Sequence, residues 1–428
     1  MKVKKHKESS DSMYGLLGKK LGHSFSKIIH EQFTSNKYEL IEKDELESFF
    51  KRKDFNGINV TIPYKHDVIT YLDELSPEAQ EIGAVNTITN IGGKLKGYNT
   101  DYYGLEKALS YNDISVYNND IIILGNGSTS RTIKVYCNNN FAKNIYILAR
   151  NPNENEYHFN DVDKFKSVSI VFNATPVGMF PNNNQDTLID LNTLPNLTSV
   201  IDVVYNPLYS NLLIEAKLAG KKTVNGLMML VLQAVKSIEL FHNVAIQEKD
   251  VMKYYKELLF AQSNLAFIGM PMSGKSFIGK LCADKYNKTF IDLDKSIEKT
   301  KEMTIPEIFD SYGEKAFRRY ETNEVEKYSK QHSYAISCGG GVILNQNNMK
   351  MLRQNSVIIF IDFPLTELKK CNPKDRPLLK NNNMLDKLFK ERYNIYKENA
   401  DIIINKSDFD EKSTLSKIEV KLNEYFRT

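Results

Sequence analysis

A glycine-rich segment in the second half of the chain has the residue types and spacing of a phosphate-binding loop. Gly269 and Gly274 frame the pattern Gly-x-x-x-x-Gly-Lys-Ser, which ends in Lys275 and Ser276 and follows the apolar run 265–268. In such a loop, backbone amides surround the β-phosphate of a nucleotide, the lysine reaches the β- and γ-phosphates, and the hydroxyl ligates Mg²⁺. The segment therefore predicts a nucleotide site. Hydrolases, motors and small-molecule kinases all share this loop, so it does not select the reaction.

Two carboxylates follow the next apolar run along the chain. Asp292 and Asp294 occur in the segment Phe-Ile-Asp-Leu-Asp-Lys. At the end of a strand, side chains at positions i and i+2 point the same way. The pair could therefore serve a metal ion and a substrate together, and a solvated charge cluster is the alternative interpretation.

The first half contains a second glycine-rich turn, Gly-Asn-Gly-Ser-Thr-Ser, directly after the predicted strand 121–124. The first glycine permits a tight turn, and the second lets the backbone approach a pyrophosphate at the positive end of the following helix. Because the third motif position is serine, an ordinary strand-turn-helix remains open. The candidate cofactor-binding residues in this turn are Gly125, Gly127, Ser128, Thr129 and Ser130.

The residue that follows the next strand bears on the choice of cofactor. A second strand is predicted over 144–148, and Ala149-Arg150-Asn151 comes after it, where an NAD site would place Asp or Glu against the ribose. An arginine pairs with a 2′-phosphate through its planar fork. Arg150 therefore favours NADP over NAD.

Strands and helices alternate along the whole chain. Because such alternation is typical of α/β proteins, we expect α/β architecture with largely parallel sheets. Helices are predicted over 226–241 and 249–260, and only residues 261–264 separate the second helix from the next strand. The linker between the two nucleotide-binding units is therefore nearly absent. The predicted strands cover 120–124, 144–148, 168–172, 199–203, 265–268 and 356–361.

An ordered set of short motifs spans residues 13–258. It comprises Ser24-Phe-Ser26, Asn59-Val-Thr61 with Lys65, Asn86-Thr87, Asn99-Thr100-Asp101, Asn173-Ala-Thr175, Tyr205-Asn-Pro207, and Asn225-Gly-Leu-Met-Met229 with Gln233. In this order and spacing, the set resembles shikimate dehydrogenase.

That resemblance implies a two-lobed enzyme. Residues 13–104 would form a substrate-binding lobe that helices over about 226–258 complete, and 105–225 a Rossmann-type NADP-binding lobe. Lys65 would be the proton shuttle and Asp101 the carboxylate that orients it. The implied substrate-binding residues, all neutral hydrogen-bonding groups, are Ser24, Ser26, Thr61, Asn86, Tyr205 and Gln233. The further implied NADP contacts are Thr175, Met179, Gly226 and Met229.

A second set of motifs covers residues 265 to about 410. It consists of the phosphate-binding loop, Asp292 with Asp294, Gly313 to Glu321, Gly339-Gly340-Gly341, Asp375-Arg376-Pro, and Glu391-Arg392-Tyr. This set resembles shikimate kinase. A P-loop kinase domain with a parallel sheet is therefore expected over 262–428.

The kinase resemblance assigns roles to these residues. Gly269, Gly274, Lys275 and Ser276 would bind ATP, and Lys275 and Arg376, which lies in a lid segment, would act on the transferring phosphate. Ser276 and Asp292 would hold Mg²⁺, and Asp294 would bind a ring hydroxyl and act as base. The other implied substrate-binding residues are Arg318 and Arg392, which would clamp a carboxylate, and Gly339, Gly340 and Gly341, which would let the backbone approach the ring.

The chain departs from the two family patterns in places. Lys27 stands where the dehydrogenases usually have proline, and Ala149 where asparagine often precedes the phosphate-binding arginine. In the lid, Lys369 and Lys370 stand where kinases often carry another arginine. We expect the first pair to bear on cofactor preference and the second on ATP affinity.

Composition excludes several classes of function. The 428 residues carry 57 Lys+Arg against 53 Asp+Glu, a net charge of +4, which argues against a nucleic-acid partner. The sequence has neither a membrane-length apolar run nor a signal peptide, so we expect no membrane partner and a cytoplasmic location. The four cysteines are scattered and suggest neither disulfides nor zinc. Residues 1–12 form a basic extension.

We therefore expect a bifunctional enzyme, a monomer or homodimer, that uses NADP(H), ATP and Mg²⁺. It would reduce 3-dehydroshikimate to shikimate and phosphorylate shikimate to shikimate 3-phosphate. The alternatives are a metabolite sensor built from inactive domains of this kind, and a quinate or NAD-dependent dehydrogenase in the first half.

Overall fold

The structure is a computed structural model that describes residues 13–22, 25–370, 382–406 and 410–426. The chain divides into two compact units, the first of residues 1–206 and 215–255 and the second of residues 207–214 and 256–428. The basic extension 1–12, Ser24 and Arg376 lie outside the described residues. No described helix is long and apolar enough to cross a membrane.

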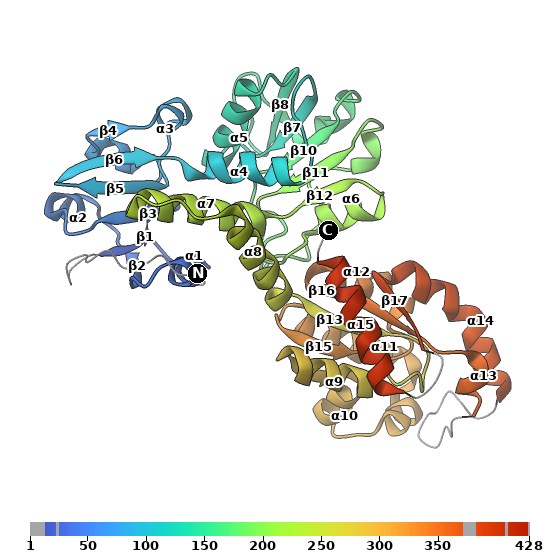
Figure 1. Ribbon diagram of the computed structural model, residues 1–428. Coiled ribbons are helices and arrows are strands. Elements are labelled where there is room, and N and C mark those ends of the chain that lie inside the picture. The colour runs from blue at the N-terminus through green and yellow to red at the C-terminus, as the bar shows by residue number, and fades with distance from the viewer. Residues whose placement is uncertain (1–12, 23–24, 371–381, 407–409, 427–428) are drawn as a thin grey trace. The chain divides into compact units, whose positions relative to one another are not determined.

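A mixed sheet forms the N-terminal part of the first unit, with strand order β2-β1-β3-β5-β6-β4 (Figure 1). β1 pairs in parallel with β2 and β3, whereas β5 pairs antiparallel with β3 and β6. The antiparallel pairs were not predicted. Gly92 and Gly93 have φ of +62° and +86° and form the β5–β6 turn, which needs positive φ at both positions. The elements are β1 (Tyr14–Gly18), α1 (Ser26–Phe33), β2 (Tyr38–Glu42), α2 (Glu47–Arg52), β3 (Gly57–Val60), η1 (Asp67–Tyr71), β4 (Glu74–Leu75), α3 (Pro77–Ile82), β5 (Thr87–Ile91) and β6 (Lys94–Tyr98).

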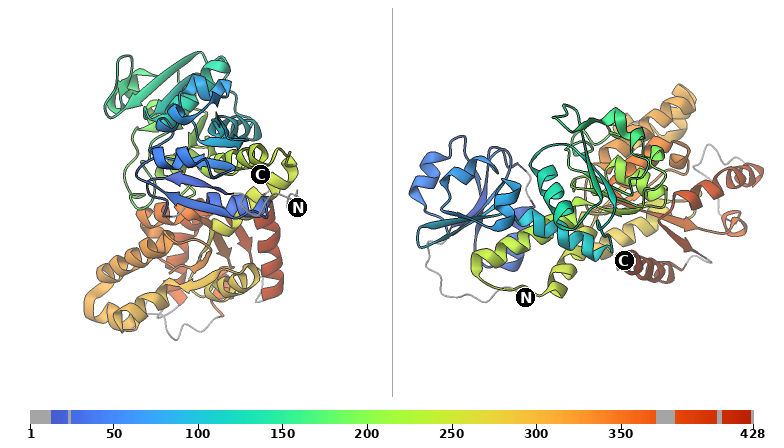
Figure 2. Two further views of the ribbon diagram at one scale, coloured as in Figure 1. Left: turned by 90° about the vertical axis from the view of Figure 1, so that its left-hand side faces the viewer. Right: turned by 90° about the horizontal axis from the view of Figure 1, so that it is seen from above.

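The second sheet of the first unit is wholly parallel, with order β12-β11-β10-β7-β8-β9. Counted from β7, this is the 3-2-1-4-5-6 order of dinucleotide-binding folds, whose ligand lies where the order reverses, between β7 and β10. Figure 2 shows this green sheet apart from the blue N-terminal one. The elements are α4 (Thr100–Tyr111), β7 (Asp120–Leu124), α5 (Ser128–Asn139), β8 (Asn144–Ala149), β9 (Tyr157–His158), η2 (Phe159–Lys164), β10 (Ile170–Asn173), η3 (Leu191–Thr193), β11 (Ser199–Asp202), β12 (Lys222–Val224) and α7 (Gly226–His242).

Helices α4 and α7 lie side by side in the first unit (Figure 1). Gly104 permits the close approach, because a Cβ there would stand 2.7 Å from the carbonyl oxygen of Met229. Each helix begins at an asparagine cap, since the Asn99 side chain accepts from the Tyr102 amide and that of Asn225 from the Leu227 amide. The two caps fix where the polar residues of these helices stand.

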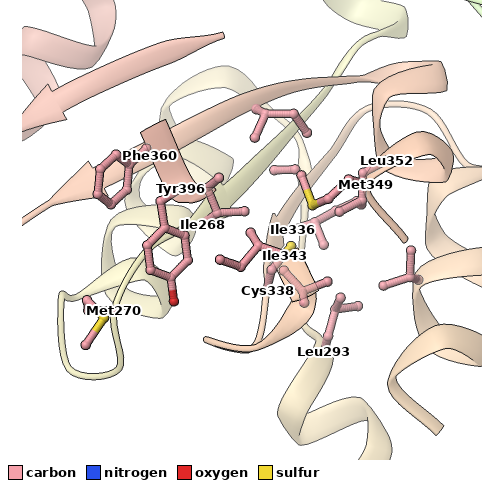
Figure 3. Packing of buried hydrophobic residues seen from close by; sticks show 14 of the residues in the cluster. Ile268, Met270, Leu293, Ile336, Cys338, Ile343, Met349, Leu352, Phe360 and Tyr396 are labelled. Atoms are coloured by element: carbon pink, nitrogen blue, oxygen red, sulfur yellow. The ribbon is translucent and has the colours of Figure 1, made fainter. Parts of the chain in front are cut away.

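The second unit is built on one parallel sheet with order β14-β15-β13-β16-β17. Helices α9 and α15 cover one face and α10, α11, α12 and α14 the other (Figure 2). Figure 3 shows the hydrophobic core between the sheet and α10, α11, α12 and α14. There the ring of Tyr396 stacks on that of Phe360, with 5.2 Å between the ring centroids. The elements are β13 (Asn264–Ile268), α9 (Lys275–Tyr286), β14 (Thr289–Asp292), α10 (Leu293–Lys301), α11 (Ile305–Ser329, interrupted at Gly313), β15 (Tyr334–Ser337), η4 (Val342–Leu344), α12 (Gln346–Asn355), β16 (Ser356–Asp362), α13 (Leu365–Leu368), α14 (Asn382–Asn399), β17 (Ile402–Asn405) and α15 (Glu411–Tyr425).

Two helices cross the division between the units. Helix α8 (Glu248–Gln262) leaves only Ser263 before β13, so the connection is even shorter than expected. Helix α6 (Asn211–Leu218) begins in the segment 207–214, which groups with the second unit although we expected it in the NADP-binding lobe. In that unit the Leu208 amide donates to the side chain of Asn355 at 2.9 Å. The predicted domain boundaries remain predictions.

Candidate functional sites

The first unit contains a pocket of about 220 Å³ that collects polar side chains from both of its lobes. β3 and the turn after it, the start of α4, and α7 supply most of the walls. The lining residues are Leu16, Ser26, Asn59, Val60, Thr61, Lys65, Asn86, Asp101, Thr129, Val203, Tyr205, Gly226, Met229, Leu230 and Gln233.

A partly buried ion pair stands in this pocket. Lys65 Nζ donates to Asp101 Oδ2 at 2.6 Å, and the side chains are only 15% and 13% exposed. Asn86 Nδ2 donates to the other carboxylate oxygen at 2.9 Å. Asp101 lies in the first turn of α4, where the helix dipole favours a negative charge. The lysine is therefore held by an oriented carboxylate and keeps further N–H donors for a ligand.

A network of hydrogen bonds between neutral side chains adjoins the Lys65–Asp101 pair. Asn59 Nδ2 donates to Thr87 Oγ1 at 3.0 Å and to Ser237 Oγ at 2.8 Å. The Thr100 amide and hydroxyl donate to Asn86 Oδ1 at 2.7 and 3.1 Å, which fixes the amide that holds Asp101. Buried polar groups must find partners, and here each serves to orient the next.

The glycine-rich turn after β7 has the geometry that a dinucleotide requires. Gly125 has φ of +98°, and a Cβ there would stand 2.8 Å from Thr175 Cγ2. Gly127 is the N-cap of α5 and offers no side-chain cap, and its Cβ position is open space. A pyrophosphate can therefore approach the first amides of α5, so these residues fit the adenine dinucleotide.

The second unit contains a cavity of about 230 Å³ at the phosphate-binding loop. Gly274 takes φ of +89°, and Lys275 Nζ donates to the carbonyl oxygens of Gly269 and Met270 at 2.9 and 2.8 Å. The lysine, at the end of the phosphate-binding loop, is thus hydrogen-bonded to the backbone at the start of the same loop. The cavity is lined by Met272, Gly274, Lys275, Ser276, Phe277, Asp292, Asp294, Ser337 and Cys338.

Oxygen ligands meet beside that lysine. Ser276 Oγ donates to Asp292 Oδ2 at 2.5 Å and shares a hydrogen bond with Ser337 Oγ at 3.1 Å. Asp292 is also the N-cap of α10, where Oδ1 accepts from the Lys295 amide at 3.2 Å. A hydroxyl and a carboxylate oxygen next to a phosphate-binding loop are the donors that Mg²⁺ takes. The residues therefore fit the ion.

Charged side chains lie against two of the three glycines after β15, Gly339 and Gly341. A Cβ on Gly339 would stand 2.7 Å from Asp294 Oδ1 and 2.8 Å from Glu321 Oε1, and one on Gly341 would overlap Arg318 Nη1 at 2.3 Å. A side chain at either position would collide with a carboxylate or a guanidinium, whereas at Gly340 it would meet the ring of Pro271 at 3.1 Å.

Two arginines with different partners reach this cluster. Arg318 Nη1 donates to Glu321 Oε2 at 3.0 Å, and its Nη2 donates to Glu314 Oε1 at 3.0 Å. Arg392 is 5% exposed and its Nη1 donates to the Gly340 carbonyl at 3.0 Å, while its buried Nε has no hydrogen-bond partner among the described residues. Burial raises the pKa of Glu321, although the Arg318 charge opposes this. The cluster therefore contains guanidinium N–H groups that could donate hydrogen bonds to a bound anion.

Comparisons with known proteins match both units. A family model described as shikimate dehydrogenase substrate binding domain matches residues 16–88. The shikimate dehydrogenase (NADP(+)) of Clostridium beijerinckii is 37% identical over 260 residues, which cover 56% of this chain and 96% of that protein. The chain belongs to the shikimate dehydrogenase family. A second family model, shikimate kinase, matches residues 271–423, so the chain joins a dehydrogenase of this family to a shikimate kinase domain.

Solved structures agree for the dehydrogenase part. A chorismate mutase/shikimate 5-dehydrogenase fusion protein from Clostridium acetobutylicum aligns with a TM-score of 0.55 at 35% identity, covering 58% of this chain and 97% of that one. The Listeria monocytogenes shikimate 5-dehydrogenase in complex with shikimate and NAD aligns with a TM-score of 0.52 at 28% identity, covering 60% and 99%. The expected Rossmann-type architecture of the first unit is confirmed.

The dehydrogenase pocket gathers most of the residues predicted for it. Thr129, Gly226 and Met229, predicted for the cofactor, line the same pocket as the predicted catalytic pair, so a nicotinamide there would adjoin the substrate. The other predicted cofactor residues are not in its lining. Gly125, Gly127 and Ser128 lie in the glycine-rich turn and at the start of α5, Ser130 and Thr175 are buried, Arg150 is exposed, and Met179 is 43% exposed. The predicted roles remain predictions, and Ser24 lies outside the described residues.

In the kinase domain, the predicted residues form two adjoining groups. Lys275, Ser276, Asp292 and Asp294 line the cavity, and the glycine cluster contacts them through Asp294. Arg376 lies outside the described residues.

Several residues of both sites were given no role from the sequence. Glu321 is 1% exposed and binds Arg318, a contact that its i+3 spacing on a helix could have indicated. Ser337 and Ser237 join their networks from a strand end and a helix face, and a lone serine carries no such signal.

Proposed function

We propose that this chain catalyses two consecutive reactions on one cyclic acid. The dehydrogenase reduces 3-dehydroshikimate with NADPH and a proton to shikimate and NADP⁺. The kinase domain transfers the γ-phosphoryl group of ATP to the 3-hydroxyl of shikimate, releasing ADP and a proton. The Lys65–Asp101 pair carries the proposal, because it lies partly buried in a pocket whose other polar residues are neutral hydrogen-bonding groups.

The reduction needs a proton donor at the ketone oxygen. NADPH supplies the hydride. Lys65 Nζ donates the proton while Asp101 keeps its ammonium aimed into the pocket. A donor placed in this way contributes about 10²–10⁴-fold to the rate. Ser26, Thr61, Tyr205 and Gln233 accept and donate hydrogen bonds to the ring hydroxyls and carboxylate, which orients the ketone.

The phosphoryl transfer relies on positioning and charge. Lys275 exchanges its carbonyl partners for phosphate oxygens, and Ser276 with Asp292 holds Mg²⁺. Asp294 accepts the proton of the attacking hydroxyl. Arg318 and Arg392 bind the ring carboxylate, and Arg376 completes the charge at the transferring phosphate.

One incubation tests both activities. The full chain is mixed with 3-dehydroshikimate, NADPH, ATP and Mg²⁺, and the fall in NADPH absorbance and the formation of shikimate 3-phosphate are followed together. Lys65→Ala should abolish reduction and leave phosphorylation of added shikimate intact, and Lys275→Ala should do the reverse. Turnover in neither assay would favour a metabolite sensor, and quinate oxidation without shikimate oxidation would favour a quinate enzyme.

A cytoplasmic location and a monomeric or homodimeric state also belong to this proposal. The mass in solution, measured by light scattering on the eluted protein, checks the second statement. A larger assembly would contradict it.

A further inference from the structure

A carboxylate lies beside the glycine-rich turn after β7, although no acidic residue directly follows β8 in the sequence. Glu156 Oε2 accepts a hydrogen bond from Asn126 Nδ2 at 2.9 Å, and Asn126 is the residue between Gly125 and Gly127. Asn126 Nδ2 also donates to the carbonyl oxygen of Asn151 at 3.1 Å. The carboxylate therefore bridges the glycine turn and the segment that follows β8.

The position of Glu156 is set by backbone structure. It directly precedes β9, and β9 pairs in parallel with the end of β8, Leu148 opposite Tyr157 and Ala149 opposite His158. In dinucleotide-binding folds, an acidic residue at the end of this second strand binds the adenosine ribose. Ala149 and Arg150 occupy that position here, and the neighbouring short strand brings a carboxylate to the same edge.

The local hydrogen bonds keep Glu156 ionised. Partial burial works against its charge, but donation from the Asn153 backbone and from the Asn126 and Asn153 side chains outweighs it and lowers the pKa. The Asn153 amide donates at 2.8 Å and its Nδ2 at 3.1 Å. All these bonds end on Oε2, and Oε1 accepts none from the described residues. Oε1 is thus available to a ribose hydroxyl.

We propose that Glu156 is a specificity-determining residue for the nucleotide and that it lets the dehydrogenase accept NADH as well as NADPH. This inference rests on the proposed function of the first unit. The carboxylate accepts a hydrogen bond from a free 2′-hydroxyl and repels a 2′-phosphate. Arg150 acts in the opposite sense, since it is exposed and has no hydrogen bond or ion pair with any described residue, so that it can pair with the phosphate.

The two residues set a balance between nucleotides. With Arg150 alone the site would select NADPH strongly, and with Glu156 alone it would select NADH. Their presence together predicts that the two nucleotides bind with affinities within about tenfold of each other, because one opposed charge at a partly exposed site changes affinity by about that factor.

Binding measurements test the inference without relying on turnover. The full chain is titrated with NADPH and with NADH, and binding is followed by nicotinamide fluorescence, which no tryptophan disturbs because the chain has none. Glu156→Gln should raise the ratio of NADPH to NADH affinity about tenfold. Arg150→Ala should lower that ratio by a similar factor. Steady-state kcat/KM ratios for the two nucleotides should move in the same directions.

Glu154→Gln is the matched control. It removes the same charge two residues away, from an exposed side chain for which no described partner exists, and should change the ratio less than about twofold. Equal effects of the Glu154 and Glu156 changes, or an unchanged ratio in Glu156→Gln, would overturn the inference. An unchanged KM for 3-dehydroshikimate in each variant shows that the dehydrogenase unit is folded. If the wild type bound no NADPH, the proposed function itself would fail.

Discussion

The two sites hold their charged groups in different ways. In the dehydrogenase, one lysine and one carboxylate pair with each other, and the rest of the pocket is neutral. In the kinase domain, Lys275 is bonded to backbone carbonyls and Arg318 to two glutamates, Glu314 and Glu321. The first site can act with its internal contacts intact, whereas the second must exchange contacts for ligand.

This difference follows from the charges that each reaction handles. A ketone reduction develops charge on one oxygen, and a single donor next to it suffices. Phosphoryl transfer brings a triphosphate next to a carboxylate, so several cations must be held together before the anions arrive. An unpaired buried charge costs free energy of folding, and before the substrate binds, the carboxylate of Glu321 offsets the charge of Arg318. We therefore expect changes to charged residues of the kinase site to act mainly on the KM for substrate, and changes to the pair in the dehydrogenase to act mainly on kcat.

The largest effect should come from breaking the pair in the dehydrogenase. Asp101→Asn leaves the size of the side chain but removes the charge that orients Lys65, and we expect kcat for reduction to fall by about 10²-fold or more. The KM for 3-dehydroshikimate should change less than threefold, since Asp101 positions the lysine and binds little of the ring. Steady-state kinetics at saturating NADPH measure both.

A matched control exists in the same unit. Asp44 pairs with Lys19 at 3.5 Å, but its side chain is 85% exposed, and Asp44→Asn should leave kcat within about twofold. A higher KM for 3-dehydroshikimate with unchanged kcat in Asp101→Asn would show that the carboxylate binds substrate and does not orient the lysine.

The fold was largely predictable from the sequence where strands are buried on both faces. The prediction for 120–124 matches β7, whose residues Ile121 to Leu124 are fully buried, and those for 199–203 and 356–361 fall within one residue of the observed ends. Continuous apolar runs mark such strands clearly. Strands β5 (Thr-Ile-Thr-Asn-Ile) and β6 (Lys-Leu-Lys-Gly-Tyr) alternate polar and apolar residues and so lack this signal. The Gly92-Gly93 pair between them, which received no role from the sequence, could have indicated their hairpin.

The sites were predictable to the extent that motifs carry them. Lys65 and Asp101 lie 36 positions apart and meet at 2.6 Å, a contact that the family resemblance implied and spacing alone could not. Glu156 went unnoticed because its place depends on β9, a strand of only two residues. A side chain positioned by a short strand pairing leaves no periodic pattern in the sequence.

A smaller effect should appear when the exchange of partners in the kinase site is impaired. Arg318→Lys keeps the charge but cannot bond two carboxylates through a planar fork, nor bind a ring carboxylate in a bidentate way. We expect the KM for shikimate to rise about tenfold, from the loss of a charge-assisted hydrogen bond, with the KM for ATP unchanged. Initial rates of ADP release at varied shikimate provide the measurement.

The neighbouring arginine is the control for that change. Arg319 is exposed and lies over the Tyr320 ring, so Arg319→Lys should leave both KM values within about twofold. Equal KM values for shikimate in Arg318→Lys and the wild type would contradict the substrate-clamping role and place Arg318 in the structure of α11 alone.

A further effect concerns the stability of the dehydrogenase unit and its dependence on pH. His30 is buried in the dehydrogenase and stacks on Tyr38 at 4.0 Å. Burial and the nearby His242 charge lower its pKa to about 3, against the weaker opposing effect of a hydrogen bond with Asn59. The unfolded chain takes up a proton at His30 near pH 6.5, and the folded chain does not. This contribution to stability is therefore complete above pH 6.5 and is lost as the pH falls from there towards 3.

Linkage gives the size of that loss. Between pH 6.5 and pH 5, His30 should cost the dehydrogenase about 2 kcal/mol, at about 1.4 kcal/mol per pH unit. His30→Phe keeps an aromatic ring against Tyr38 and should remove this slope. His66→Phe, at a histidine whose side chain is 70% exposed, should keep it. Hydrogen exchange of amides in α1 and β2 at several pH values measures the free energy of opening for this unit separately from the kinase domain. An equal slope in wild type and His30→Phe would assign the acid sensitivity to other groups.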